Sequence, residues 1–138
     1  LNKGNDKEIK SLASFGLHFG NAYQMRNDYL DYFGNSKSTG KNIIEDLIEG
    51  KTTLPIIYAM QNASEADQKV IRSSFKQADQ SAEGTIIKIL RKYKSDIYMD
   101  NKIEEQTQYA IDSLGQITDS KYKDKLIELA SYCMKRTS

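Results

Sequence analysis

The sequence predicts an all-α fold, and three observations support this. Apolar residues recur at spacings of three and four, which is the period of a helix rather than of a strand. The 138 residues include one proline and eight glycines, so few positions would interrupt a helix. Alternating β-branched residues, which are typical of strands, are scarce. At this length we expect a single all-helical domain over residues 1–138 with a core of its own.

The first predicted helix runs from about Lys7 to Phe33 and has two distinct faces. With about 100° per residue, one apolar stripe holds Leu12, Phe15, Phe19, Tyr23, Leu30 and Phe33. A second face carries Gln24, Asn27, Asp28 and Asp31, in line with the small residues Ala13, Gly16 and Gly20. Two interpretations of the small residues stay open. Another helix approaches closely there, or the small residues line a cavity with the acids at its mouth.

The middle of the chain shows a loop and two helix boundaries. Residues 34–42 are rich in glycine, serine and asparagine and predict a loop. A short helix is expected over Ile43–Glu49, ending at Gly50 as a left-handed cap. The next helix is expected to begin after Thr53 as N-cap, with Pro55 in its first turn, where a missing N–H costs little.

The remaining helices follow from a capping signal and from periodicity. Ser64 with Asp67 resembles a capping box in which aspartate replaces the usual glutamate, and it opens a helix to about Gln77. Three further helices are predicted: Ala82–Lys94, Asn101–Ile117 and Lys121–Lys135.

Composition excludes several classes of function. The chain has 20 basic and 19 acidic residues and a net charge of +1. This balance disfavours nucleic-acid binding. The one cysteine, Cys133, rules out an internal disulfide framework and fits a reducing compartment. No apolar run approaches the roughly 20 residues that span a bilayer, and no signal peptide is visible. We therefore predict a cytoplasmic protein without a membrane-spanning segment.

The acidic turn of the first helix has a chemical interpretation. Carboxylates three or four residues apart on a helix, such as Asp28 and Asp31, can share a hydrated Mg²⁺, which takes oxygen ligands and keeps most of its waters. One such turn is weak evidence, because acidic turns are common on ordinary helix surfaces.

A wider arrangement of motifs resembles a known family. The segments "GLHFGNAYQMRNDYLDYFG", "STGKN" and "EDLIEGKTTLP" resemble the second half of trans-isoprenyl diphosphate synthases, also called polyprenyl synthetases, and the long-chain enzymes of quinone biosynthesis in particular. The matching elements occur in the family's order: Gly20, Tyr23-Gln24, Asn27-Asp28-x-x-Asp31, Gly40-Lys41, Glu45-Asp46 and Gly50 to Pro55.

The resemblance implies a fold and a set of partners. The fold would be a helical bundle of the isoprenoid synthase type around a deep pocket, with Mg²⁺ as cofactor and a homodimer as the full-length assembly. The substrates would be isopentenyl diphosphate and an allylic diphosphate. The family carries two Asp-rich motifs, and nothing in Leu1 to Ser14 could supply the first. We therefore interpret the chain as the C-terminal half of such a synthase, inactive without the N-terminal half.

The resemblance also implies roles for single residues. Asn27, Asp28 and Asp31 would hold the metal and its waters. Gln24, Lys41 and Lys51 would bind the diphosphate, and Gln24 and Lys41 would be the catalytic residues. Glu45 and Asp46 would order metal waters or hold the two lysines.

One position departs from the family pattern. The first residue of the motif is usually aspartate and is Asn27 here, so a neutral carbonyl oxygen replaces a carboxylate and Mg²⁺ binding should weaken. The alternative function is therefore a non-catalytic regulatory subunit, or a helical binding module, that keeps the synthase fold.

Overall fold

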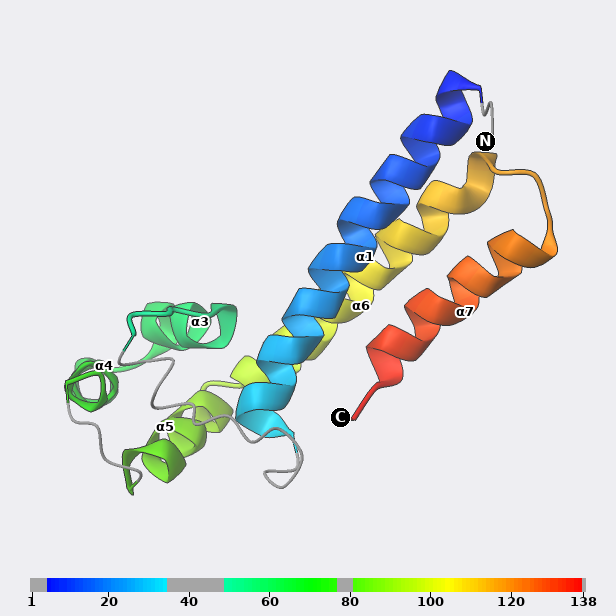
Figure 1. Cartoon of the computed structure of the whole chain (residues 1–138). Helices are drawn as coiled ribbons and strands as arrows, with labels where there is room; N and C mark the ends of the chain where they lie inside the picture. Colours follow the sequence, from blue (N-terminus) through cyan, green and yellow to red (C-terminus); the bar gives the residue numbers. More distant parts are fainter. Residues whose placement is uncertain (1–4, 35–48, 77–80, 138) are drawn as a thin grey trace. The chain divides into compact units, whose positions relative to one another are not determined.

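The computed structural model describes residues 5–34, 49–76 and 81–137. Every regular element among them is a helix (Figure 1), which confirms the all-α prediction. In chain order the elements are α1 (Asp6–Phe33), α3 (Leu54–Asn62), α4 (Glu65–Ser74), α5 (Ser81–Lys92), α6 (Ser95–Ser113), the 3₁₀ helix η1 (Leu114–Gln116) and α7 (Lys121–Lys135). No helix within the described ranges is long and apolar enough to cross a bilayer.

The described chain forms two compact units. The first unit holds α1 up to Arg26, the part of α6 from Asn101, η1 and α7. The second unit holds the last turns of α1 from Asn27, then α3, α4, α5 and the start of α6. The single domain expected over residues 1–138 stays a prediction.

Helix α1 has a clear signal at each end. Its first turn is a capping box, because the Glu8 N–H donates to Asn5 Oδ1 at 2.9 Å and the Asn5 N–H donates to the Glu8 carboxylate at 3.2 Å. At the other end, a Cβ on Gly34 would lie 2.5 Å from the carbonyl oxygen of Leu30. Only glycine fits there without a backbone shift, so the sequence ends the helix at Phe33.

The predicted apolar stripe of α1 is partly wrong. Phe15 and Leu30 are buried as expected, but Leu12 and Tyr23 are 45% and 44% exposed. In the first unit the buried face runs instead through Phe15, Ala22 and Arg26, which lie at about 280° to 320° when Leu12 is taken as zero. Leu12 and Tyr23, at about 0° and 20°, fall outside this sector, because neighbouring helices cover α1 from one side only.

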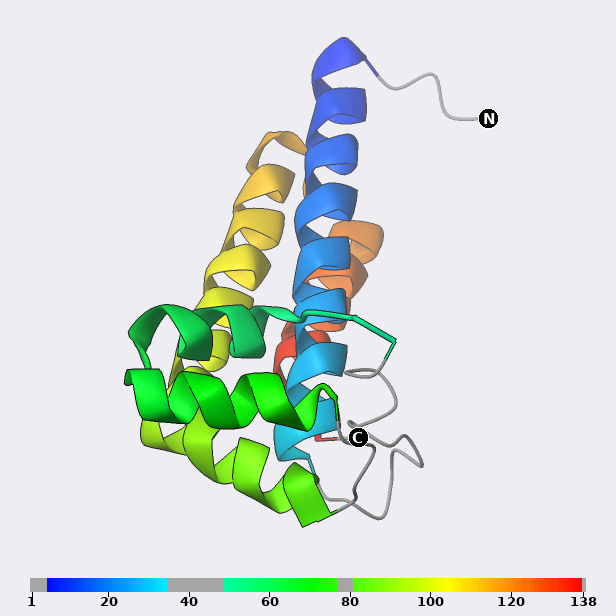
Figure 2. The ribbon, with the colours of Figure 1, turned by 90° about the vertical axis from the view of Figure 1, so that its left-hand side faces the viewer.

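The first unit is a three-helix arrangement. The two views in Figures 1 and 2 show α1, α6 and α7 side by side. A hydroxyl pair, Ser14 with Ser113 at 2.8 Å, and a His18–Gln106 hydrogen bond at 2.9 Å join α1 to α6. Because the residue number rises on one helix as it falls on the other, these two helices are antiparallel. The core of the unit contains Phe15, Ala110, Leu114 and Ala130.

The second unit surrounds a core built mainly of isoleucine. Helices α3, α4 and α5 pack together and against the last turns of α1. The buried side chains of this core are Tyr32, Ile56, Ala59, Ile71, Ile86, Ile89 and Leu90. Several of them are completely inaccessible to solvent, so this core supplies most of the apolar stabilisation of the unit.

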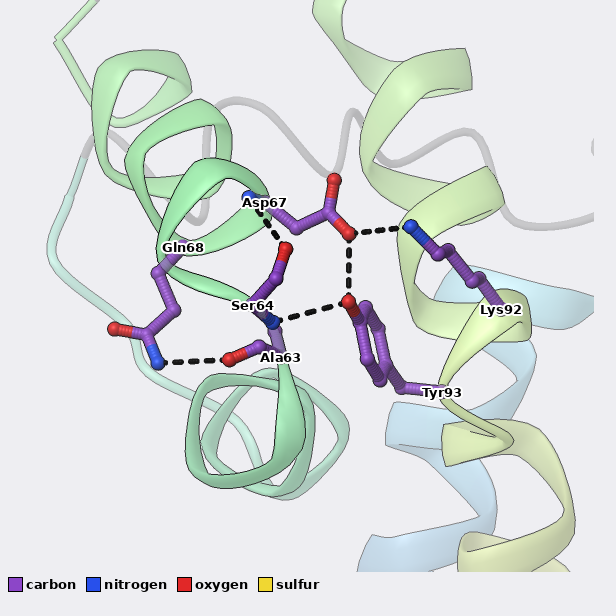
Figure 3. A network of polar contacts seen from close by, with 6 residues as sticks. All are labelled: Ala63, Ser64, Asp67, Gln68, Lys92 and Tyr93. Atoms are coloured by element: carbon purple, nitrogen blue, oxygen red, sulfur yellow. Dashed lines mark hydrogen bonds and ion pairs between the residues drawn. The ribbon is translucent and has the colours of Figure 1, made fainter.

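A polar network ties the start of α4 to the end of α5 (Figure 3). One carboxylate oxygen of Asp67 accepts from Lys92 Nζ and from the Tyr93 hydroxyl, each at 2.7 Å. Ser64 Oγ accepts from the Asp67 N–H at 3.3 Å, which confirms Ser64 as the N-cap. The Ser64 N–H donates to the Tyr93 hydroxyl at 3.0 Å. The predicted capping box is therefore only half formed, because aspartate is shorter than glutamate and Tyr93 occupies the returning position.

This network predicts a pH-dependent contribution to stability. The hydrogen bond from Lys92 holds the pKa of Asp67 below its ordinary value of 3.8, and the reciprocal bond raises the pKa of Lys92 above 10.5. The contribution is therefore complete between these two values. It is lost as the pH falls through the folded pKa of Asp67 or rises through that of Lys92.

Asp67→Asn is therefore expected to lower the Tm most near neutral pH and least at very low and very high pH. Thermal unfolding at a series of pH values measures this effect. Asp119→Asn is the matched control, because Lys123 lowers the pKa of Asp119 in the same way but from within the same short segment. An equal loss of Tm in both variants would contradict the role of Asp67 as a tie between helices.

The boundary between α5 and α6 differs from the prediction. The sequence predicts that one helix ends at Lys94 and that the next begins at Asn101. In the structure α5 ends at Lys92 and α6 begins at Ser95. Lys94 adopts the left-handed conformation, with φ of 59°, and turns the chain within two residues. No glycine or proline marks this corner, so the sequence carried no signal for it.

The other predicted boundaries have mixed outcomes. Gly50 has φ of +76°, which confirms its left-handed conformation, whereas the helix expected over Ile43–Glu49 falls almost entirely outside the described residues. Helix α4 ends at Ser74 rather than near Gln77. Helix α7 matches its prediction at both ends.

Candidate functional site

Four of the predicted site residues lie on consecutive turns of α1. Gln24, Asn27, Asp28 and Asp31 belong to one continuous helix, and they share a sector of about 60° to 160° from Leu12. Gln24 is exposed, whereas the other three side chains are half-buried. This face therefore presents amide and carboxylate oxygens that are partly shielded from solvent.

The segment that carries Lys51 is joined to the last turns of α1 by a hydrogen bond. The Thr53 hydroxyl donates to the hydroxyl of Tyr32 at 2.8 Å, and Tyr32 directly follows Asp31 in the sequence. This bond joins residues 51–53 to the last turns of α1. Thr53 is the N-cap residue of α3, as predicted, but its side chain makes no capping bond, because its hydroxyl is donated to Tyr32 instead.

The Lys51 side chain is exposed and pairs locally. Its Nζ lies 3.0 Å from a carboxylate oxygen of Glu49, and both side chains are about three-fifths exposed. Ion pairs between exposed groups contribute little to stability, so the Glu49 contact alone holds Lys51 only weakly.

The last turn of α1 has a second attachment inside the second unit. The Arg91 guanidinium lies over the ring of Phe33, with 5.6 Å between the guanidinium carbon and the ring centroid. Tyr29 and Phe33 form a tilted aromatic pair with centroids 5.2 Å apart. The Arg91 contact joins the last turn of α1 to α5, and the Tyr29–Phe33 pair lies within α1 itself.

In the first unit, the end of α7 contacts the turn that carries Gln24. The buried Arg26 donates from Nη2 to the carbonyl oxygen of Met134, and the Arg136 guanidinium lies 4.6 Å from the ring centroid of Tyr23. The Arg26 contact satisfies a carbonyl in the last turn of a helix, which such turns otherwise leave without an intrahelical partner. The arginine–tyrosine contact joins residues more than a hundred positions apart, and no sequence pattern signalled it.

Three predicted site residues fall outside the described residues: Lys41, Glu45 and Asp46. Their roles stay predictions. Within the described residues, the structure brings together the Asp31 turn and the Lys51 segment.

The donor set on α1 fits a hard cation. Asn27, Asp28 and Asp31 offer only oxygen ligands, and two of these are carboxylates on one helix face. Among residues 5–34, 49–76 and 81–137, no three His, Cys, Asp or Glu side chains lie close enough together to hold a metal ion. Mg²⁺ is commonly bound through one or two carboxylates, with waters and substrate phosphates completing its shell. The side chains of Asn27, Asp28 and Asp31 are therefore of the chemical kind that Mg²⁺ accepts as ligands.

The sequence matches a family model described as polyprenyl synthetase over residues 1–93. It is 35% identical over 128 residues to the octaprenyl diphosphate synthase of Haemophilus influenzae, which covers 92% of this chain and 39% of that protein. It is also 35% identical over 133 residues to the all-trans-nonaprenyl-diphosphate synthase (geranyl-diphosphate specific) of Rhodobacter capsulatus, covering 96% of this chain and 41% of that protein.

A solved structure agrees with these sequence relatives. The geranylgeranyl pyrophosphate synthetase of Pyrococcus horikoshii superimposes with a TM-score of 0.85 at 30% identity, covering 96% of this chain and 40% of that one. The chain thus spans about two fifths of the length of the proteins it matches.

Proposed function

Because this chain belongs to the polyprenyl synthetase family, we propose that it supplies the second Asp-rich half-site of a trans-isoprenyl diphosphate synthase. The whole enzyme would condense isopentenyl diphosphate head-to-tail with an allylic diphosphate. One observation carries the proposal. The Tyr32–Thr53 hydrogen bond joins the segment that carries Lys51 to the helix end that carries Asp28 and Asp31, and this supports a site in which one cation and two anionic groups would share a bound ligand.

The proposed reaction makes clear demands on the protein. The allylic C–O bond breaks and pyrophosphate leaves, the double bond of isopentenyl diphosphate attacks the resulting cation, and a proton is then lost. Most of the barrier lies in the negative charge that develops on the leaving pyrophosphate. Fixed cations placed where that charge appears lower the barrier. Mg²⁺, when bound, neutralises part of this charge.

The residues of this chain would divide the work. Asp28 and Asp31, with the Asn27 carbonyl, would hold Mg²⁺ and its waters. Lys51 would bind a diphosphate oxygen, since a lysine ammonium is a compact and mobile point charge. Gln24 would orient the diphosphate through its amide.

The roles proposed for the other three site residues are the following. Lys41 would act beside Lys51 as a second cation and as a catalytic group. Glu45 and Asp46 would order metal waters or hold the lysines.

The finer assignment is also a proposal. We favour a long, octaprenyl-like product, a cytoplasmic homodimer as the full-length assembly, and a role in quinone biosynthesis. The relatives' names cover octaprenyl, nonaprenyl and geranylgeranyl products, so family membership alone does not fix the product length.

A second candidate function is a non-catalytic regulatory subunit or helical binding module. Asn27 favours it, because the position that is usually a carboxylate in the family is neutral here. Gln24, Asp28, Asp31 and Lys51 favour the catalytic half-site, because a subunit that only binds protein needs no diphosphate contacts.

A chimera separates the two candidates. In it, this chain replaces the matched part of the Haemophilus influenzae octaprenyl diphosphate synthase, and incorporation of labelled isopentenyl diphosphate with farnesyl diphosphate is measured. We expect Mg²⁺-dependent elongation. A folded chimera that makes no product, beside an active parent enzyme, would overturn the catalytic proposal in favour of the regulatory one.

Asn27→Asp in the chimera is expected to lower the Mg²⁺ concentration at half-maximal turnover, on the order of tenfold, because a third carboxylate strengthens the oxygen donor set. The measurement is a Mg²⁺ titration of the initial rate. Asn101→Asp, which adds a carboxylate at an exposed position of α6, controls for the change in net charge. Titration curves that coincide for the chimera with and without the Asn27→Asp change would argue against a ligand role at this position.

A further inference from the structure

Helix α7 lies at the edge of the first unit (Figure 1), and one of its sides is exposed along the whole helix. With Lys121 taken as zero and about 100° per residue, the buried Ala130 and Cys133 fall at about 180° and 120°. The sector from about 0° to 100° is exposed at every position. We call it the outer face, and its members are Lys121, Tyr122, Lys125, Leu129 and Tyr132.

The outer face exposes aromatic side chains at both ends of the helix. Tyr122 and Tyr132 are 71% and 65% exposed, the largest fractions among the large hydrophobic side chains of the described residues. They stand about 15 Å apart along the helix, and the exposed Leu129 lies between them. Exposed apolar groups gathered on one face typically mark an interaction surface.

Positive charge is concentrated on the same helix. Helix α7 has four lysines and two acids, a net charge of +2, whereas the whole chain has +1. Both charged residues of the outer face are lysines, and the Lys121 ammonium lies 5.2 Å from the ring centroid of Tyr122. Lys125 Nζ lies 2.6 Å from a carboxylate oxygen of Glu128, just outside the face. Ion pairs between exposed groups are weak, so Glu128 offsets only part of this charge.

This combination of residue types distinguishes between kinds of partner. Lysine is depleted at protein–protein interfaces, although tyrosine is enriched there. At the surface of a bilayer both are favourable. Tyrosine rings sit at the level of the headgroups, lysine stems cover apolar surface while the ammonium stays in water, and anionic lipids attract lysines near the surface. Tyrosine, leucine and lysine on one exposed face therefore favour a lipid surface as the partner.

We propose that the outer face of α7 docks the protein on an anionic phospholipid bilayer, with the helix lying parallel to the surface. The purpose of this docking rests on the proposed function. A polyprenyl diphosphate joins a long apolar chain to an anionic head, so it partitions from water into a bilayer. A synthase held at the surface releases its product there, and the reaction that consumes the product acts at a membrane.

Co-sedimentation with vesicles tests the docking, with the chain alone and with the chimera. Both are expected to bind vesicles of equal parts phosphatidylglycerol and phosphatidylcholine, more weakly at high salt, and to bind phosphatidylcholine alone poorly. Lys121→Gln combined with Lys125→Gln should lower the partition coefficient on the order of tenfold. Lys69→Gln with Lys88→Gln is the matched control, because it removes the same charge from exposed positions of α4 and α5. It should stay within about twofold of the unmodified protein.

A second pair of changes tests the aromatic part of the face. Tyr122→Ser combined with Tyr132→Ser should lower the partition coefficient on the order of tenfold at low and at high salt, because these rings enter the interface. Ile97→Ser is the control, since Ile97 is 54% exposed on α6 and lies outside the outer face. Circular dichroism should be the same for all variants, because every changed position is exposed.

Four results would overturn the inference. The first is a chain and a chimera that both stay in the supernatant with anionic vesicles. The second is binding by the α7 variants equal to that of their controls. The third is binding by the chain that the chimera lacks, because another part of the enzyme then covers the face. The fourth is self-association of the chain that the tyrosine changes abolish, because a second copy is then the partner.

The same experiment separates this inference from the proposed activity. A chimera that binds anionic vesicles but makes no product would leave the outer face assigned and overturn only the catalytic proposal. A chimera that elongates its substrate but does not bind the vesicles would overturn only the docking.

Discussion

Asp28→Asn combined with Asp31→Asn is expected to reduce turnover of the chimera by on the order of 10²-fold or more. Both substitutions keep the shape of the side chain and remove its charge, so the loss reports on the anionic oxygens rather than on packing. In the proposed site these oxygens would hold Mg²⁺, and without them the charge of the leaving pyrophosphate would be poorly compensated. Initial rates at saturating Mg²⁺ and substrate measure the effect.

The control for this prediction is Asp112→Asn on α6. Asp112 is exposed and accepts a hydrogen bond from Gln108 one turn earlier on the same helix. The rate should stay within about twofold of the unmodified chimera, since surface changes away from such sites have small effects. A double variant of Asp28 and Asp31 as active as this control would exclude both carboxylates from the reaction.

Leu90→Ala should cost the most in stability. Leu90 is completely inaccessible to solvent and lies in the core of the second unit among Ile56, Ile71 and Ile86. Removing a buried leucine side chain typically costs about 2–5 kcal/mol. Natural domains have only about 5–15 kcal/mol of total stability, so this loss threatens the whole unit.

Urea unfolding of the isolated chain measures the loss, and Leu129→Ala is the matched control. Leu129 is 46% exposed on α7, so its truncation should cost well under half as much. Because Tyr32 belongs to the same core as Leu90, we also expect Leu90→Ala to loosen the Tyr32–Thr53 bond that positions Lys51. Similar urea midpoints for the two variants would show that this core does not hold the unit together.

Local chemistry explains which parts of the fold could be predicted. Apolar periodicity predicts the helices. The side-chain cap at Ser64 and the left-handed conformation of Gly50 could be predicted because each depends on a single residue and its neighbours. The Asn5–Glu8 capping box is a local signal of the same kind, with asparagine and glutamate at the required spacing, but the sequence analysis did not predict it.

Long-range contacts explain what could not be predicted. The corner at Lys94 has no glycine; its backbone N–H donates to the Arg91 carbonyl and its carbonyl accepts from the Tyr98 N–H, so it joins the end of α5 to the first turn of α6. Likewise, the sequence predicts a capping role for the Thr53 hydroxyl, but in the structure this hydroxyl donates to Tyr32. Tyr32 is distant in the sequence and lies beside Thr53 only after folding.

The candidate site shows the same division. Helical spacing placed Asp28 and Asp31 on one face, and the structure keeps them there. The attachment of the Lys51 segment to that helix end depends on a tyrosine and a threonine 21 positions apart, and no spacing rule connects such a pair. The exposed outer face of α7 could not be foreseen either, since a pattern of apolar residues does not say which of them the rest of the chain covers.

A Cβ built on Gly16 or on Gly20 meets no neighbouring part of the described chain within 4 Å, and this open space has an evolutionary consequence. Glycine is the smallest residue, so every mutation at these positions adds atoms, and random drift can only fill that space. A lineage in which this polypeptide works by itself would lose both glycines quickly, because alanine and leucine make better helices. A lineage in which another molecule or chain segment occupies that space would purge those same changes. The residues that natural variants carry at these two positions therefore record whether selection has acted on the part or on the whole.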